Sequence, residues 1–324
     1  VGHVGVVVDG HGTCVEVGIE RGTELPAARA SALEARRHEV LGVWVQGHKA
    51  AEVLDAEVHD LRIGIAKPQD GRDGERADRV AQGSGLAQDG LARLVEALGL
   101  GVRERLSSFT QRFPYAPYRV QNIGRAARYI DGTVLLPGET FSMNDVIRER
   151  TIANGYTTGI VVGPGGIFAE DLGGGVSAAT TTVWTAAFFA GLERVETRAH
   201  SIYISRYQPG LEATVAWGVF DMRFRNNTPN AVLITAKTTN TSMTVRMWGT
   251  RVFDSVRAEF GDRTNVRPHT TIRSTSPSCT AQTGMDGFDI VVDRVFVRAG
   301  EDVAREKIRT TYKASPDVTC RRSG

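Results

Sequence analysis

The sequence predicts an α+β fold in which an antiparallel sheet packs with a few helices. Two helix-like segments lie near residues 118–130 and 177–191, and strand-like runs follow from residue 201 onwards. In these later runs apolar and polar residues alternate with a period of two, and β-branched residues dominate. A few helices combined with an antiparallel sheet make the predicted fold α+β rather than alternating βαβ.

The composition narrows the class of protein. At 324 residues the chain has room for two domains, or for one domain with extensions. Its 41% hydrophobic and 23% charged residues are ordinary for a soluble globular protein. A net charge of +2 gives no reason to expect nucleic acid or an anionic membrane surface as a partner. No run of about 18 apolar residues is present, so no transmembrane segment is expected, and the first residues lack the basic start of a signal peptide.

The first hundred residues differ in composition from the rest. Trp44 is their one aromatic residue, and they draw almost wholly on Gly, Ala, Val, Arg, Asp, Glu, Leu and His. A core without Phe or Tyr is weak for a segment of this length. The bias is that of a G- and C-rich gene read in a wrong frame or strand. We therefore expect residues 1–102 to be a misassigned start or a disordered region, and we assign no role to Cys14.

From residue 103 onwards the elements can be placed in order. An extended segment precedes a helix expected from about Tyr118 to Ile130, which has an apolar face formed by Ile123, Ala126, Ala127 and Ile130. Asp131-Gly132 ends this helix and Pro137-Gly138 marks a turn. The run GIVVG reads as a short strand and PGGIF as a glycine-containing turn.

A second helix follows three consecutive glycines, at residues 173–175. After it we expect strands at SIYISRY, EATVAWGVFDMRFRNN, AVLITAKTT and SMTVRMWGTRV, and further strands near the end at FDIVVDRVFVRAG and EKIRTTYKA. The polar stretches NNTPN and TTNTS supply turns between strands.

The junction of glycines and helix is the first candidate for chemistry. Gly174 and Gly175 let the backbone approach another group closely, and Ser177 falls in the first helical turn, where free N–H groups favour negative charge. His200 and Asp221 follow in an order that suits a nucleophile, base and orienting acid, with the N–H after Ser177 as an oxyanion donor. A structural interpretation stands beside this one, because serine is common at helix starts.

Other candidates also have two interpretations. Glu139 suits a general acid or a ligand-orienting carboxylate, or a cap on the turn at Pro137-Gly138. Arg206 and Tyr207 suit a carboxylate or sugar of a cell-wall peptide, or two ordinary strand residues. Three threonines inside the second helix either line a groove or pack tightly against the sheet, namely Thr180, Thr181 and Thr182. No metal-ligand spacing or phosphate loop is visible, so neither metal nor cofactor is expected.

Six blocks of residues resemble a known family in order and spacing. They are LLPGETFSMND, IANGYTTG, EDLGGGVS, AAFFAGLERVETRAHS, YQPGLEATVAW and DMRFRNNTPNAVLI. Together they are similar to the VanW-like domain, which is named after an accessory protein of vancomycin-resistance clusters, over about residues 103–250. Residues 251–324 resemble the β-rich extension of members from high-GC Gram-positive bacteria.

The resemblance implies an extracytoplasmic or membrane-associated protein of the cell envelope, linked to peptidoglycan and, in some members, to glycopeptide resistance. It also favours a disulfide between Cys279 and Cys320, since disulfides fit exported proteins. Many members have Cys followed by Gln after the glycines, where this chain has Ser177 and Ala178. A hydroxyl needs stronger base assistance than a thiol.

These departures leave three functions open. We expect a non-catalytic module that binds peptidoglycan or acts as an accessory protein. The first alternative is a peptidoglycan hydrolase or transpeptidase that uses Ser177, His200 and Asp221 in a transglutaminase-like order. The second is a structural domain that docks another envelope protein.

Overall fold

The computed structural model describes residues 2–8, 13–19, 44–45, 99–276 and 279–321. The chain divides into two compact units, one of residues 1–62 with 66–84 and the other of residues 63–65 with 85–324. In the first unit, three strands form an antiparallel sheet in the order of the chain: β1 (Gly2–Val8), β2 (Thr13–Ile19) and β3 (Trp44–Val45). Most of residues 1–102 lies outside the described residues, and their origin stays a prediction.

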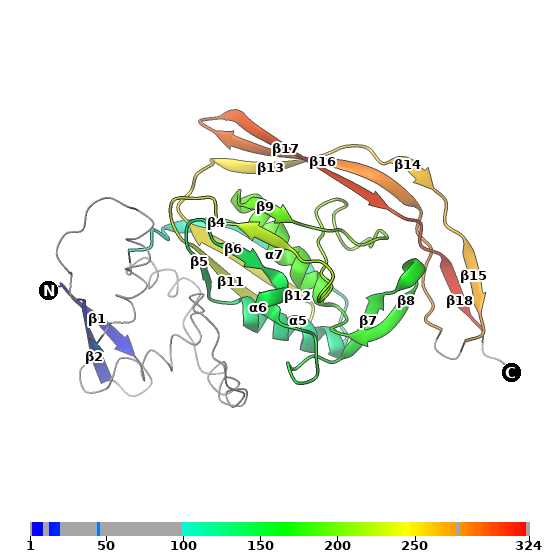
Figure 1. The fold of residues 1–324 in the computed structure, drawn as a ribbon, viewed down its shortest axis with the longest axis horizontal. Helices are drawn as coiled ribbons and strands as arrows, with labels where there is room; N and C mark the ends of the chain where they lie inside the picture. The colour runs from blue at the N-terminus through cyan, green and yellow to red at the C-terminus, as the bar shows by residue number, and fades with distance from the viewer. Residues whose placement is uncertain (1, 9–12, 20–43, 46–98, 277–278, 322–324) are drawn as a thin grey trace. The chain divides into compact units, whose positions relative to one another are not determined.

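The second unit is built on a four-stranded antiparallel sheet (Figure 1). Its strands lie in the order β4 (Glu104–Arg112), β12 (Ser242–Gly249), β11 (Val232–Thr238) and β5 (Thr133–Leu135). Along β12 buried and half-buried residues alternate, so Met243, Val245 and Met247 all face the core. Two helices cover this core, α5 (Pro117–Ile130) on β11 and α7 (Val176–Ala190) on β4 and β12.

Helix α7 is buried nearly all round, as expected for a helix that is apolar on every face. Its threonines fit because every hydroxyl finds a backbone partner. Thr180 and Thr182 donate to carbonyls one turn back in their own helix, those of Val176 and Ala178. The threonines are thus packed in the core rather than lining a groove, the second of the two interpretations offered by the sequence.

Two smaller pieces complete this part of the unit. A three-stranded sheet has the order β6 (Thr140–Ser142), β10 (Arg223–Arg225) and β9 (Glu193–Glu196), and short helix α6 (Met143–Ile147) follows β6. The hairpin of β7 (Thr158–Val162) and β8 (Phe168–Leu172) turns through the 3-10 helix η1 (Pro164–Gly166) and leads into the three glycines before α7.

The C-terminal part is β-rich, as the sequence suggests. Strand β16 (Gly287–Arg298) pairs with β17 (Glu301–Tyr312) to form the long ribbon coloured orange to red in Figure 1. On its other side β16 pairs with β13 (Ser255–Phe260) and β14 (Thr264–Arg267). Beyond them β15 (Thr271–Ser274) and β18 (Asp317–Cys320) pair in parallel, and Cys279 and Cys320 are joined by the expected disulfide.

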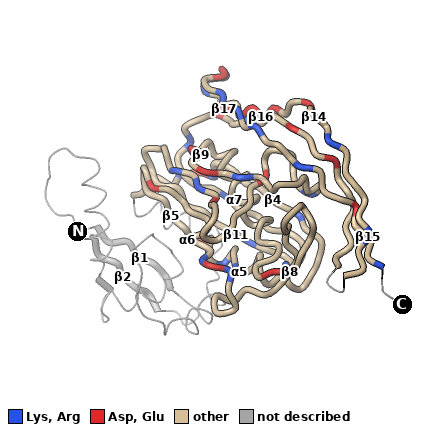
Figure 2. Tube along the Cα trace, turned by 45° about the vertical axis from the view of Figure 1, so that its right-hand side comes forward, with Lys and Arg blue, Asp and Glu red and all other residues tan. Residues whose placement is uncertain are grey.

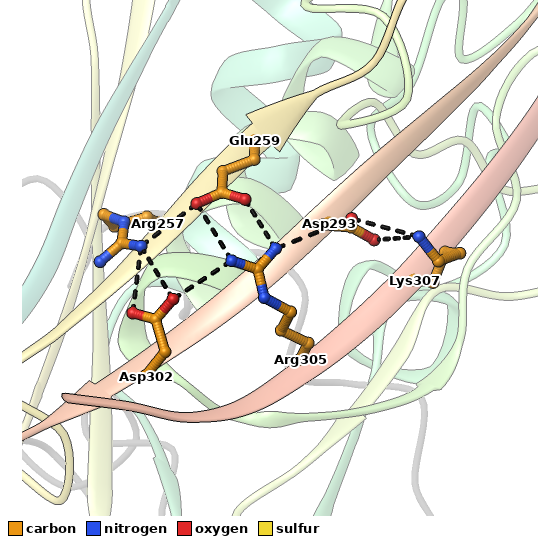
Figure 3. Close-up of polar contacts among 6 residues, drawn as sticks. All are labelled: Arg257, Glu259, Asp293, Asp302, Arg305 and Lys307. Carbon is orange, nitrogen blue, oxygen red and sulfur yellow. Dashed lines mark hydrogen bonds and ion pairs between the residues drawn. The ribbon is translucent and has the colours of Figure 1, made fainter.

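Charges of both signs lie along β16 and β17 (Figure 2). Six charged residues form a cluster across β13, β16 and β17 (Figure 3): Arg257, Glu259, Asp293, Asp302, Arg305 and Lys307. Exposed ion pairs add little stability one by one. Charges along an edge strand instead discourage its pairing with other chains.

The two helices predicted from the sequence are confirmed, but two of the predicted strands are wrong. Residues 201–207 and most of 212–227 are irregular, apart from β10 and isolated bridges at Ile202 and between Ala216 and Phe220. The alternation of apolar and polar residues here reflects burial of side chains and not pairing of strands. Tyr203 and Tyr207 are buried, but the backbone groups of this segment bond within turns and to α7. No helix in the described ranges is long and apolar enough to cross a membrane.

Candidate functional site

A groove of about 990 Å³ lies at the start of α7. Its walls come from the β7–β8 hairpin, the first turn of α7, the irregular segment 197–217 and one stretch of β17. Of the residues singled out from the sequence, it contains Gly175, Ser177, His200, Arg206 and Tyr207. Side chains far apart in the chain therefore meet in one concavity, which is the usual setting of a ligand site.

The irregular segment is held against α7 by the threonine face of the helix. Thr181 Oγ1 donates to the carbonyl of Ala213 and accepts from its N–H, at 3.0 and 3.2 Å. One turn further on, Thr185 donates to the carbonyl of Leu211. These bonds satisfy backbone groups that would otherwise be buried without partners, and they fix the position of Glu212 between them.

Glu212 and His200 form a buried ion pair or hydrogen bond. Nδ1 of His200 lies 2.6 Å from Oε2 of Glu212, and the side chains are 7% and 0% exposed. The other carboxylate oxygen, Oε1, has no hydrogen-bond partner within the described part of the chain. The ring of Tyr207 stacks on that of His200, with centroids 5.6 Å apart. This environment fixes both the orientation of the imidazole and the nitrogen that faces the acid.

Two tyrosines surround the pair, and both are held neutral. Burial raises the pKa of Tyr207 to about 12. Burial, and secondly the charge of Glu212, raise the pKa of Tyr312, whose hydroxyl accepts a hydrogen bond from the N–H of Gly210 at 2.9 Å. The pair is therefore flanked by neutral aromatic groups, of which Tyr207 lines the groove.

Ser177 does not meet a base in this arrangement. Its hydroxyl is hydrogen bonded to that of Thr214 at 2.9 Å, and no hydrogen bond joins it to His200 among the described residues. The N–H of Ala178, expected as an oxyanion donor, is bonded to the carbonyl of Gly175. The hydroxyl is thus bonded to the irregular segment and the N–H to the glycine turn, and Ser177 does not cap the helix, because the N-cap of α7 is Gly175 and no side chain bonds there.

The acid beside His200 is Glu212, not the expected Asp221. Asp221 accepts hydrogen bonds from Ser142 Oγ and from the N–H of Asn144, at 2.5 and 2.9 Å. These bonds anchor it to the start of α6, since a carboxylate is a good acceptor for the free N–H groups of a first helical turn. The expected order of Ser177, His200 and Asp221 therefore does not correspond to a hydrogen-bonded triad.

Two other candidates have structural positions outside the groove lining. Glu139 Oε2 accepts from the N–H of Leu136 at 2.8 Å, so it caps the turn at Pro137-Gly138. Gly174 lies against β7: a Cβ there would come within 2.2 Å of the backbone of Gly159. Gly175, with a φ of +90°, is the N-cap of α7 and does reach the groove.

Sequence reasoning missed Glu212, Arg119 and Trp217, which also line the groove. A signal for Glu212 is present in LEATVAW, where one carboxylate interrupts an apolar run and must find a partner if buried. Arg119 lies on the first turn of α5, and its Nε is buried without a hydrogen-bond partner in the described residues. Within those same residues, no group of three or more His, Cys, Asp or Glu could hold a metal ion.

Comparison with known proteins places residues 118–248 in a family described as VanW like protein. A curated relative, an uncharacterized protein called YoaR from Bacillus subtilis (strain 168), is 36% identical over 137 residues. That match covers 42% of this chain and 45% of the relative, so the chain spans less than half of the length of the curated relative it matches. No solved structure matches the chain. Residues 118–248 are therefore identified as a VanW-like domain, which contains α7, nearly all of α5 and most of the groove.

Proposed function

We propose that the chain is an extracytoplasmic, envelope-associated module that binds the carboxylate-bearing peptides of peptidoglycan in its groove without cleaving them. The observation that carries this proposal is the charge of the groove lining. Its arginines outnumber its acidic residues, with Arg119, Arg150, Arg194, Arg198, Arg206 and Arg309 against Glu149, Asp171 and Glu212. Arginine suits carboxylates because its planar fork binds both oxygens at once.

Binding is favoured over catalysis by the state of the serine. A serine hydroxyl is a weak nucleophile unless a base takes its proton. Thr214, the hydrogen-bond partner of Ser177, cannot act as such a base. The Cys279–Cys320 disulfide supports an extracytoplasmic location, because such bonds persist in oxidising compartments.

Sedimentation with purified peptidoglycan sacculi tests binding. The full chain should pellet with sacculi, and Arg206→Gln, at the exposed rim of the groove, should weaken binding about tenfold, the effect of one charge-assisted hydrogen bond. Arg273→Gln is the control: Arg273 is an exposed arginine on β15 outside the groove, and its loss should change nothing. Equal binding by all three proteins, or none by the wild type, contradicts the proposal.

A hydrolase or transpeptidase remains the second candidate. The buried His200–Glu212 pair favours it, since an acid that orients an imidazole is part of many catalytic sites. The same incubation distinguishes the two functions when the supernatant is examined by mass spectrometry. Release of muropeptides by the wild type, lost in both Ser177→Ala and His200→Gln, would make the chain an enzyme; we expect no release.

A further inference from the structure

A partly exposed tryptophan lies at the rim of the groove. Trp217 is 44% exposed and Val219, two residues on, is 76% exposed. Both belong to the tip between Ala216 and Phe220, and Trp217 lines the groove. Large apolar side chains left in water beside a concavity often mark a binding surface.

The tip has a fixed shape. The N–H groups of Val219 and Phe220 both donate to the carbonyl of Ala216, at 3.1 Å, and the N–H of Ala216 donates back to Phe220 at 3.1 Å. Gly218 adopts a φ of +71°, which a closed turn of this kind requires and which glycine reaches without strain. The indole is therefore presented by a closed turn rather than by a loose loop.

A second set of bonds braces the tip from behind. The Nδ2 group of Asn144 donates to the carbonyl of Phe220 at 2.9 Å, and its Oδ1 accepts from Arg150 at 2.8 Å. The guanidinium of Arg150 in turn lies over the Trp217 ring, 5.7 Å from its centroid. Asp221 completes the brace by accepting from the N–H of Asn144. The residue expected to belong to a triad thus acts as a positioning residue for the tryptophan.

We infer that Trp217 forms a stacking platform for a pyranose ring, and that the groove therefore binds the glycan strand of peptidoglycan as well as its peptides. The inference rests on the proposed function and adds a second ligand class to the same groove. The face of an indole is electron-rich, so it attracts the slightly positive C–H hydrogens on one side of a sugar ring. Glu149, Asp171 and Arg198 line the same groove and supply acceptors and a donor for sugar hydroxyls.

A lipid surface fits the same tip less well. Trp217 shares its groove with the exposed carboxylates of Glu149 and Asp171, whose charges would lose their water if the tip entered the apolar layer of a membrane. The groove is also concave, and a membrane requires apolar side chains that project beyond their surroundings.

Calorimetric titration of the full chain with the β-1,4-linked tetramer of N-acetylglucosamine tests the platform. The wild type should bind it, Trp217→Ala should lose at least fivefold in affinity, and Trp217→Phe should retain most of it because a smaller ring still stacks. Tyr115→Ala is the matched control, since Tyr115 is a 64% exposed aromatic outside the groove lining. Unchanged thermal unfolding would show that the exposed Trp217 substitutions leave the fold intact.

Three outcomes overturn the inference. They are absence of tetramer binding to the wild type, equal affinity of Trp217→Ala and wild type, and a Trp217→Ala effect on binding to phosphatidylglycerol vesicles in place of the saccharide. The proposed function fails separately, through the sacculus assay with Arg206→Gln. If sacculi bind through Arg206 but the tetramer does not bind, the stacking platform is ruled out while the proposed binding of peptides stands.

Discussion

Helix α7 begins at a groove and ends inside a packed core, and only its end is held by a distant side chain. At the start, the N–H groups of Val176 and Ala178 bond to the carbonyls of Gly173 and Gly175 only a few residues away. The end is also closed by a local turn, in which the N–H groups of Gly191 and Leu192 bond to the carbonyls of Phe188 and Ala187. In addition, the guanidinium of Arg294 on β16, more than a hundred residues further along the chain, donates to these two carbonyls and to that of Leu192.

The difference explains why the two ends can serve different purposes. The glycine turn closes the start of α7 without a side chain, so the side chain of Ser177 is left to line the groove. At the other end Arg294 is only 1% exposed and also pairs with Glu306, so its charge is committed to the core. It joins the C-terminal ribbon to the VanW-like domain.

The largest effect on stability is expected at the end of α7 that Arg294 contacts. Arg294→Met should lower the free energy of unfolding by about 3–5 kcal/mol, because Glu306 and three backbone carbonyls at and just beyond the end of α7 lose a buried charged partner. Arg305→Met, in the exposed cluster of Figure 3, is the control and should cost less than about 1 kcal/mol. Urea unfolding of both variants gives the comparison, and equal costs would remove the structural role given to Arg294.

At the start of α7, the glycine that lies closest to β7 should tolerate no side chain. Gly174→Ala places a Cβ within 2.2 Å of the Gly159 backbone and should cost about 3 kcal/mol, since backbone cannot move aside as a flexible side chain can. Gly124→Ala provides the opposite case: this glycine of α5 has open space around its Cβ position, and alanine should stabilise the helix by up to about 1 kcal/mol. Melting temperatures that change in the same direction for both would contradict this account.

A smaller effect is expected from the groove wall between α7 and the irregular segment. In the unfolded chain the Tyr207 hydroxyl ionises near its ordinary pKa of 10, whereas burial raises the pKa of the folded side chain to about 12. The unfolded state then holds fewer protons between these values, so stability falls as pH rises from about 10 to 12 and is unaffected below. The loss attributable to Tyr207 is at most about 2–3 kcal/mol.

Comparison of wild type and Tyr207→Phe across this range isolates that contribution. The variant should lose less stability than the wild type between pH 10 and 12, as measured by urea unfolding at each pH. Parallel curves for the two proteins would mean that Tyr207 ionises in the folded protein as freely as in the unfolded one.

The sequence was sufficient for elements whose partners are local. The apolar face of α5, the glycine turn before α7 and the hairpin of β11 and β12 depend on neighbouring residues, and all are found where predicted. The irregular segment was wrongly predicted to be strands, because the alternation of apolar and polar residues indicates only which side chains are buried. Its backbone groups bond to threonine hydroxyls of a helix some thirty residues earlier and not to a neighbouring strand. The prediction that Asp221 is the acid beside His200, where the structure has Glu212, failed for the same reason. Which acid contacts His200 depends on how the irregular segment folds back.

The central claim is that arginines of the groove bind carboxylates of peptidoglycan, and chemically altered sacculi test it most directly. The full chain is sedimented with untreated sacculi and with sacculi whose free carboxylates have been converted to amides. Amidation removes the negative charge while keeping the glycan and the shape of the peptide, so the account predicts at least a tenfold loss of affinity. Undiminished binding to the amidated sacculi would contradict it.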